Sequence, residues 1–333
     1  MQLKVFLSLL ILAIIPHLAY SENTPELYHT GIVCAVDMGS NTFKFVVSEI
    51  KDGKYLQYTD VRKTAAVGDD LKLSEQKTGH KQISEAKLNE IKLLLAGFQD
   101  ECERKTGSRK LNAIATAAFR EAENIRMISE QLQQQEIEMK VLTAEEESAY
   151  AYEAATLGAE GFAVADLGSR TTEFVIKAGD SYRWVEIPTG YKVAWDEFYE
   201  KSTQFTQAID AHLQRLKELV GEKEKGILNS GHQLMMIEVG ETSSYVLGIP
   251  QNQIEGKVIT RDQIQKTLKD LSSMNADSFA NLKKDFKDAP KVFPRLIFID
   301  FLLAQTNHDR FIGTDRELNV AIVYRISRSH TKK

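Results

Sequence analysis

One stretch of the chain occurs twice, and this repeat constrains the fold more than any other feature of the sequence. Residues 35–47 read AVDMGSNTFKFVV and residues 164–176 read VADLGSRTTEFVI, so Asp37 and Asp166 hold the same place, 129 residues apart. In each copy an apolar run ends at the Asp, Gly and hydroxyl residues follow, and a second apolar run begins, which predicts two strands joined by a turn. A repeat of this length is too long for a solenoid unit, and it indicates one domain written twice.

Strands alternate with helices along the rest of the chain, which predicts an α/β fold. A helix capped by Ser84 keeps apolar residues at a period near 3.6 until Gly107 ends it. Another helix begins near Ala144, because Thr143 and Glu146 form a capping-box pattern. The same plan restarts at the second copy of the repeat.

We therefore expect two domains of similar plan with a cleft between them, at residues 30–157 and 158–326. A chain of 333 residues, 43% of them hydrophobic, is large enough for two cores. The net charge of −5 gives no overall positive field, so we expect no nucleic acid among the partners. Cys34 and Cys102 are too few for a disulfide scaffold or a zinc site, and we expect both to be buried free thiols.

The first 21 residues look like a signal peptide rather than part of the fold. Lys4 precedes the apolar run VFLSLLILAII, Pro16 breaks it, and small residues follow at Ala19 and Ser21. We expect cleavage after Ser21 and a periplasmic or secreted protein with no stable membrane span. An uncleaved anchor is the alternative, although the run is short for a span of about 20 residues.

The two turns are the candidate site. If they face each other across the cleft, their N–H groups and hydroxyls can hydrogen-bond one phosphate, and Asp37 and Asp166 can hold the Mg²⁺ that neutralises it. An Asp also stabilises a turn through its own side chain, but two Asp residues in matched contexts favour a metal site. The expected phosphate-binding residues are Gly39, Ser40, Asn41 and Thr42 in the first copy and Gly168, Ser169, Arg170 and Thr171 in the second.

Three cations outside the turns are candidate phosphate clamps. These are Arg62, Lys63 and Arg120, since Arg binds phosphate oxygens through two parallel N–H groups. Each of them alone is equally well explained as surface charge.

Two carboxylates, Glu147 and Glu173, are candidate catalytic groups, because a carboxylate beside a bound phosphate can orient and deprotonate water. Acids in the first turn of a helix also complement its dipole. That alternative accounts for Glu145 and Glu146 but leaves Glu147, which stands one turn inside the helix.

Four ordered motifs resemble the family of exopolyphosphatases and guanosine pentaphosphate phosphohydrolases (Ppx/GppA). They are AVDMGSNTFKFVVSEI, IATAAFREAEN, VLTAEEESAYAY and VADLGSRTTEFVI, and the likeness extends over residues 31–326. The resemblance implies the actin and sugar-kinase superfamily fold, with two ribonuclease-H-like domains and Mg²⁺-assisted attack of water on a terminal phosphoryl group. It places the catalytic base on Glu147, the metal-site Asp on Asp166, and its acidic partner on Glu173.

The sequence also departs from that family. Its second turn should carry three glycines, but here Ser169 and Arg170 replace two of them, and Glu241 stands where Gly is usual. Two functions fit these residues. One is an exported phosphohydrolase that releases terminal phosphate from polyphosphate or a related phosphoanhydride, either alone or as a homodimer. The other is a catalytically weak polyanion-binding sensor or scaffold; a sugar or acid kinase fits only a chain that is not exported.

Overall fold

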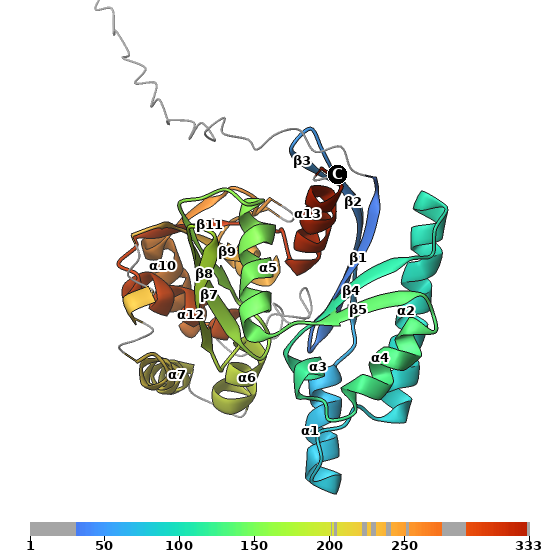
Figure 1. Ribbon diagram of the computed structural model, residues 1–333. Coiled ribbons are helices and arrows are strands. Elements are labelled where there is room, and N and C mark those ends of the chain that lie inside the picture. Colours follow the sequence, from blue (N-terminus) through green and yellow to red (C-terminus); the bar gives the residue numbers. More distant parts are fainter. Residues whose placement is uncertain are drawn as a thin grey trace, which may run out of the picture.

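The computed structural model describes residues 31–331 except 201, 203–204, 222–224, 228–230, 238–240, 251–252 and 275–290. Two mixed β-sheets with flanking helices form an α/β protein of two lobes (Figure 1), which confirms the predicted fold class. The expected signal peptide lies outside the described residues. Among those residues, no helix is long and apolar enough to cross a membrane.

The first lobe is built on a five-stranded sheet in the order β3-β2-β1-β4-β5. β1 pairs antiparallel with β2 and parallel with β4, so the repeated hairpin sits at the centre of the sheet. Its strands are β1 (Val33–Met38), β2 (Thr42–Lys51), β3 (Lys54–Thr64), β4 (Leu111–Ala115) and β5 (Ile137–Val141). Its helices are α1 (Val67–Thr78), α2 (Glu85–Thr106), α3 (Ala117–Glu121), α4 (Ile125–Gln133) and α5 (Ala144–Thr156).

The second lobe repeats this plan in the order β8-β7-β6-β9-β11, and β10 adds a sixth strand beside β11. β6 pairs antiparallel with β7 and parallel with β9, as β1 does with β2 and β4. Its strands are β6 (Phe162–Asp166), β7 (Thr172–Ala178), β8 (Ser181–Ile187), β9 (Gln233–Ile237), β10 (Val258–Thr260) and β11 (Arg310–Gly313). Its helices are α6 (Tyr191–Ala194), a π-helical turn (Trp195–Tyr199), α7 (Phe205–Leu219), α9 (Glu241–Val246), α10 (Arg261–Ser272), α12 (Val292–Gln305) and α13 (Leu318–Thr331).

The protein has three hydrophobic layers, one inside each lobe and one between the two sheets. One core lies between the first sheet and α2 and α4, and another lies between the second sheet and α7, α10 and α12. The middle layer contains α5 and α13, which stand between the two sheets (Figure 1) and bury Tyr152 and Val323 completely. Because both sheets pack on this shared layer, the two repeated hairpins are held in a fixed relation to each other.

Local signals in the sequence placed several helix ends. The Ser84 hydroxyl accepts a hydrogen bond from the Lys87 N–H at the start of α2, and Gly107 ends that helix with a φ of 75°. Thr143 and Glu146 form the expected capping box at the start of α5. These expectations are confirmed. They could be made from the sequence because each cap depends only on neighbouring residues.

The expectation of free thiols is wrong. Cys34 on β1 and Cys102 on α2 form a disulfide across the first core, with their Cα atoms 5.9 Å apart. The two residues are 68 positions apart in the sequence, and only the packing of α2 on the sheet brings them together. Counting cysteines excluded a multi-disulfide scaffold but did not exclude a single bond.

Candidate active site

The two repeated turns face each other across one cleft. Its lining includes twelve of the thirteen residues expected at the site, namely Asp37, Gly39, Ser40, Asn41, Thr42, Glu147, Asp166, Gly168, Ser169, Arg170, Thr171 and Glu173. We call this space the central cleft. Arg120 does not line it but contacts one of the carboxylates that do.

The turns have the same backbone geometry. A Cβ atom added at Gly39 would lie 2.9 Å from the Thr42 carbonyl oxygen, and one added at Gly168 would lie 2.6 Å from the Thr171 carbonyl oxygen. Contacts this close exclude a side chain at both glycines. The two turns are therefore alike in structure as well as in sequence. Each turn fixes the end of its strand, β1 or β6, in the same way.

Asp37 and Asp166 end these two strands and are almost fully buried. Burial raises the pKa of Asp37 to about 6 and that of Asp166 to about 7, although the nearby Lys44 ammonium lowers both. The Oδ1 atom of each is buried and has no hydrogen-bond partner among the described residues. A buried carboxylate oxygen without a partner is a position where a cation is stabilising.

These carboxylates fit a magnesium ion. Mg²⁺ prefers oxygen ligands, keeps several of its waters and binds proteins through one or two carboxylates plus substrate phosphates. No group of three or more His, Cys, Asp or Glu side chains among the described residues is arranged to enclose a metal. The two aspartates offer oxygen atoms of the type that a Mg²⁺ shared with a substrate phosphate would use.

Lys44 is a site residue that sequence reasoning missed. It lies directly opposite Asp37 in the hairpin, with its Nζ 3.6 Å from Asp37 Oδ2 and 3.5 Å from Glu317 Oε2. Burial alone would lower its pKa, but Glu317 and Asp37 outweigh burial and raise it, so the ammonium stays charged. A single lysine inside the apolar strand FKFVV was the available signal.

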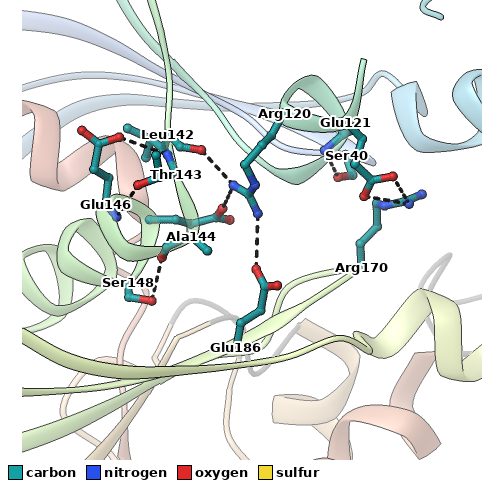
Figure 2. A network of polar contacts seen from close by, with 12 residues as sticks. Ser40, Arg120, Glu121, Leu142, Thr143, Ala144, Glu146, Ser148, Arg170 and Glu186 are labelled. Atoms are coloured by element: carbon teal, nitrogen blue, oxygen red, sulfur yellow. Dashed lines mark hydrogen bonds and ion pairs between the residues drawn. The ribbon is translucent and has the colours of Figure 1, made fainter. Parts of the chain in front are cut away.

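Glu147 enters the cleft from the first turn of α5. Burial raises the pKa of Glu147 to about 7, and the hydrogen bond from Arg120 opposes this rise. Arg120 Nη1 donates to Glu147 Oε2 at 2.8 Å. The same Nη1 donates to the Leu142 carbonyl at 2.8 Å, while Nη2 contacts Glu186 Oε2 at 3.3 Å (Figure 2). Arg120 is thus occupied by protein groups, and in this conformation it positions Glu147.

Glu173 pairs with Asp166 in the β6–β7 register and with Glu186 in the β7–β8 register. Burial, followed by the charges of Glu147 and Asp166, raises the pKa of Glu173 well above its usual value. Its Oε1 is buried without a hydrogen-bond partner among the described residues. Glu173 therefore adds a third acceptor to the floor of the central cleft.

Arg170 reaches across the cleft instead of into it. Its Nη2 lies 3.0 Å from Glu121 Oε2 on α3 of the other lobe (Figure 2). Its side chain also passes Gly68, where an added Cβ would lie 3.3 Å from Nη1. Arg170 thus ties the second turn to the first lobe.

Two other candidate clamps lie outside the central cleft. Arg62 on β3 pairs with Glu317 at 2.9 Å, and Lys63 is its exposed neighbour on that edge strand. The cleft instead contains Thr116 and Tyr191, which the sequence did not single out. Tyr191 begins α6, where its N–H donates to the Gly168 carbonyl at 3.1 Å and so holds the second turn in place.

Comparisons with known proteins agree with this architecture. The model of the Ppx/GppA phosphatase family matches residues 46–299. A Ppx/GppA family member from Aquifex aeolicus superposes with a TM-score of 0.73 at 18% identity, over 91% of this chain and 98% of that one. An exopolyphosphatase from Cytophaga hutchinsonii superposes with a TM-score of 0.74 at 14% identity, over 90% and 98%. At such identities the structural likeness concerns the fold, and none of the curated proteins matches the sequence.

Proposed function

Because the chain belongs to the Ppx/GppA phosphatase family, we propose that it releases terminal phosphate from polyphosphate or a related phosphoanhydride. One observation carries the proposal. Two turns of the same geometry meet at a cleft in which Asp37 and Asp166 present buried carboxylate oxygens without protein partners, beside the buried carboxylates of Glu147 and Glu173. Positioned charges and a base next to a bound phosphate are what phosphoryl transfer requires.

In this proposal the residues of the chain have distinct roles. The turn residues from Gly39 to Thr42 and from Gly168 to Thr171 bind the terminal phosphate, and Lys44 offsets its charge. Glu147 takes a proton from water as the water oxygen forms a bond to phosphorus. The bond from phosphorus to the bridging oxygen breaks, and the shortened chain leaves with the electron pair. Arg120 and Glu173 hold Glu147 and the water in line.

Asp37 and Asp166 would hold Mg²⁺, which when bound neutralises charge on the phosphate oxygens. Without a metal ion, four buried acids share this cleft, and burial, followed by the charges of neighbouring carboxylates, raises the pKa values of Asp37, Asp166 and Glu147. Both the site and the phosphate it would bind thus favour a divalent ion.

We also propose that the protein is exported and acts in the periplasm or outside the cell. The apolar run before residue 21 motivates this proposal. The disulfide between Cys34 and Cys102 supports it, because such bonds persist in oxidising compartments and are rare in the cytosol. Export disfavours a guanosine pentaphosphate substrate, which belongs to the cytosol. N-terminal sequencing of exported protein should begin at Glu22, and a retained apolar run would refute cleavage.

Release of orthophosphate by the purified chain, residues 22–333, tests the activity. With polyphosphate as substrate we expect Mg²⁺-dependent release that EDTA abolishes. A chain that binds polyphosphate but releases no phosphate under any metal condition would refute hydrolysis.

Arg170 favours a second candidate, a polyanion-binding sensor. Its ion pair with Glu121 spans the two lobes at the cleft, where a glycine would place no side chain. If Arg170 obstructs catalysis, the double variant Ser169→Gly/Arg170→Gly should raise hydrolysis from a low level. If Arg170 instead serves a hydrolase as a phosphate clamp, the double variant should lose activity.

A further inference from the structure

The chain segment at the start of α13 meets the first hairpin at Lys44. Glu317 Oε2 lies 3.5 Å from Lys44 Nζ, and Asn319 Nδ2 donates to the Lys44 carbonyl oxygen at 3.3 Å. Leu318, between these two residues in the sequence, lines the central cleft. Both contacts follow from the position of α13, which stands beside β2 in the layer between the two sheets (Figure 1).

The Glu317 carboxylate is held through both of its oxygens. Its Oε1 accepts a hydrogen bond from Arg62 Nη1 at 2.9 Å, while its Oε2 faces the Lys44 ammonium. The Glu317 side chain is only 7% exposed, and it is not among the residues that line the central cleft. Lys44 does line that cleft. Glu317 therefore contacts the ammonium from outside the cleft, where it touches no ligand.

Glu317 and Asp37 share the Lys44 ammonium. Its Nζ is 3.6 Å from Asp37 Oδ2 and 3.5 Å from Glu317 Oε2, and both distances exceed the about 2.8 Å of a charge-assisted hydrogen bond. An ammonium bonded closely to Asp37 would compete with a metal ion for that carboxylate. Because Glu317 also attracts the ammonium, Lys44 does not close on Asp37, whose Oδ1 has no hydrogen-bond partner among the described residues.

We propose that Glu317 is a positioning residue that holds Lys44 off Asp37 and thereby sets how tightly the central cleft binds Mg²⁺ before phosphate arrives. This inference rests on the proposed function in one respect, because it takes Asp37 and Asp166 as the residues that hold the ion. It adds a residue that touches neither the ion nor the substrate and that acts through Lys44.

The charges of this cluster predict effects of opposite sign at Glu317 and Lys44. Its acids are Asp37, Asp166 and Glu317, and its cations are Lys44 and Arg62. Glu317→Gln removes one negative charge, while the amide oxygen can still accept from Arg62, so the attraction of Lys44 to Asp37 is no longer opposed by Glu317. Lys44→Met removes the competing cation itself. The first change should weaken Mg²⁺ binding, and the second should strengthen it.

The test measures Mg²⁺ binding without substrate or turnover. The urea unfolding midpoint of protein stripped of metal and dialysed, followed against Mg²⁺ concentration, gives an apparent dissociation constant, because an ion that binds only the folded state raises the midpoint by mass action. We expect Glu317→Gln to raise this constant about tenfold or more, the scale of one charge at a few ångströms in a partly buried site. Lys44→Met should lower it by a similar factor.

A double variant separates positioning from the charge of Glu317 itself. If Glu317 acts through Lys44, then Glu317→Gln in the Lys44→Met background should change the Mg²⁺ dissociation constant by no more than about twofold. If its charge attracts the ion directly, the two effects should add. Glu153→Gln is the matched control, because Glu153 is a partly buried acid that pairs with Arg325 on α13 and does not line the central cleft. It should leave the constant unchanged.

The outcomes distinguish this inference from the proposed function. Unchanged or tighter Mg²⁺ binding in Glu317→Gln, weaker binding in Lys44→Met, additive effects in the double variant, or an equal loss in Glu153→Gln would each refute the positioning role and leave the metal site standing. Opposite, non-additive effects at Glu317 and Lys44 would support it even when the parent chain releases no phosphate. If Mg²⁺ does not stabilise the parent, the inference fails, and release of orthophosphate decides the proposed function separately.

Discussion

Replacing Asp37 by Asn should stabilise the metal-free protein, and by an amount that depends on pH. Burial raises the pKa of Asp37 from 3.8 to about 6. A carboxyl group whose pKa is higher in the folded state stabilises the fold fully below pH 3.8, and this contribution is lost as the pH rises through 6. A shift of about two units corresponds to up to about 3 kcal/mol of unfolding free energy lost by pH 8. Asn carries no charge and avoids this loss.

Urea unfolding at pH 4 and pH 8, in EDTA, measures the effect. The difference in unfolding free energy between Asp37→Asn and the parent should grow by up to about 3 kcal/mol from the lower to the higher pH. Asp180→Asn, at an exposed turn position, is the control and should show no such change. An equal difference at both pH values would refute the claim that the charge of Asp37 destabilises the metal-free fold. Mg²⁺ should stabilise the parent at pH 8 and have less effect on Asp37→Asn.

Three further outcomes follow from the site and the core. Turnover should rise as the pH passes through about 7, where Glu147 ionises, and Arg120→Met should move that limb to higher pH in a kcat profile, because the guanidinium lowers this pKa. Gly190→Ala should abolish phosphate binding in a titration, since a Cβ there would lie 2.3 Å from the Gly168 carbonyl oxygen. Gly97→Ala is the control and should leave phosphate binding unchanged, because nothing lies within 4 Å of a Cβ added there. A Gly190→Ala variant that still binds phosphate would contradict the turn geometry. In urea unfolding without reductant, Cys34→Ser should lower the unfolding free energy by about 4 kcal/mol, the loop-closure value for a 68-residue separation. An unchanged unfolding midpoint would contradict a stabilising disulfide.

The repeated hairpin could be predicted because its information is local. Each copy carries its own strand pattern, its own close-packed glycine and its own Asp, so the fold class and the facing turns follow from two short stretches of sequence. The caps at Ser84 and Thr143 were predictable for the same reason. In contrast, α1 was missed because only residues near its start, such as Val67 and Leu71, are buried, which leaves no apolar stripe to detect.

What the sequence did not provide depends on contacts between distant segments. Lys44 is a site residue because Glu317, immediately before the last helix, lies beside it on the first sheet. Arg170 was expected to bind phosphate, and its link to Glu121 exists only because the two lobes are held at a particular distance. Such pairings require the packed middle layer and cannot be obtained from spacing along the chain.

The most direct test of the central claim is the rate of phosphate release from polyphosphate by two neighbouring variants. Glu147→Gln should reduce Mg²⁺-dependent turnover by about 10²–10⁴-fold, the usual contribution of a general base, with little change in polyphosphate affinity. Glu145→Gln, on the same helical turn but outside the residues that line the central cleft, should keep nearly full activity. Equal losses in the two variants, or a parent chain that binds polyphosphate and releases no phosphate with Mg²⁺, would contradict the account.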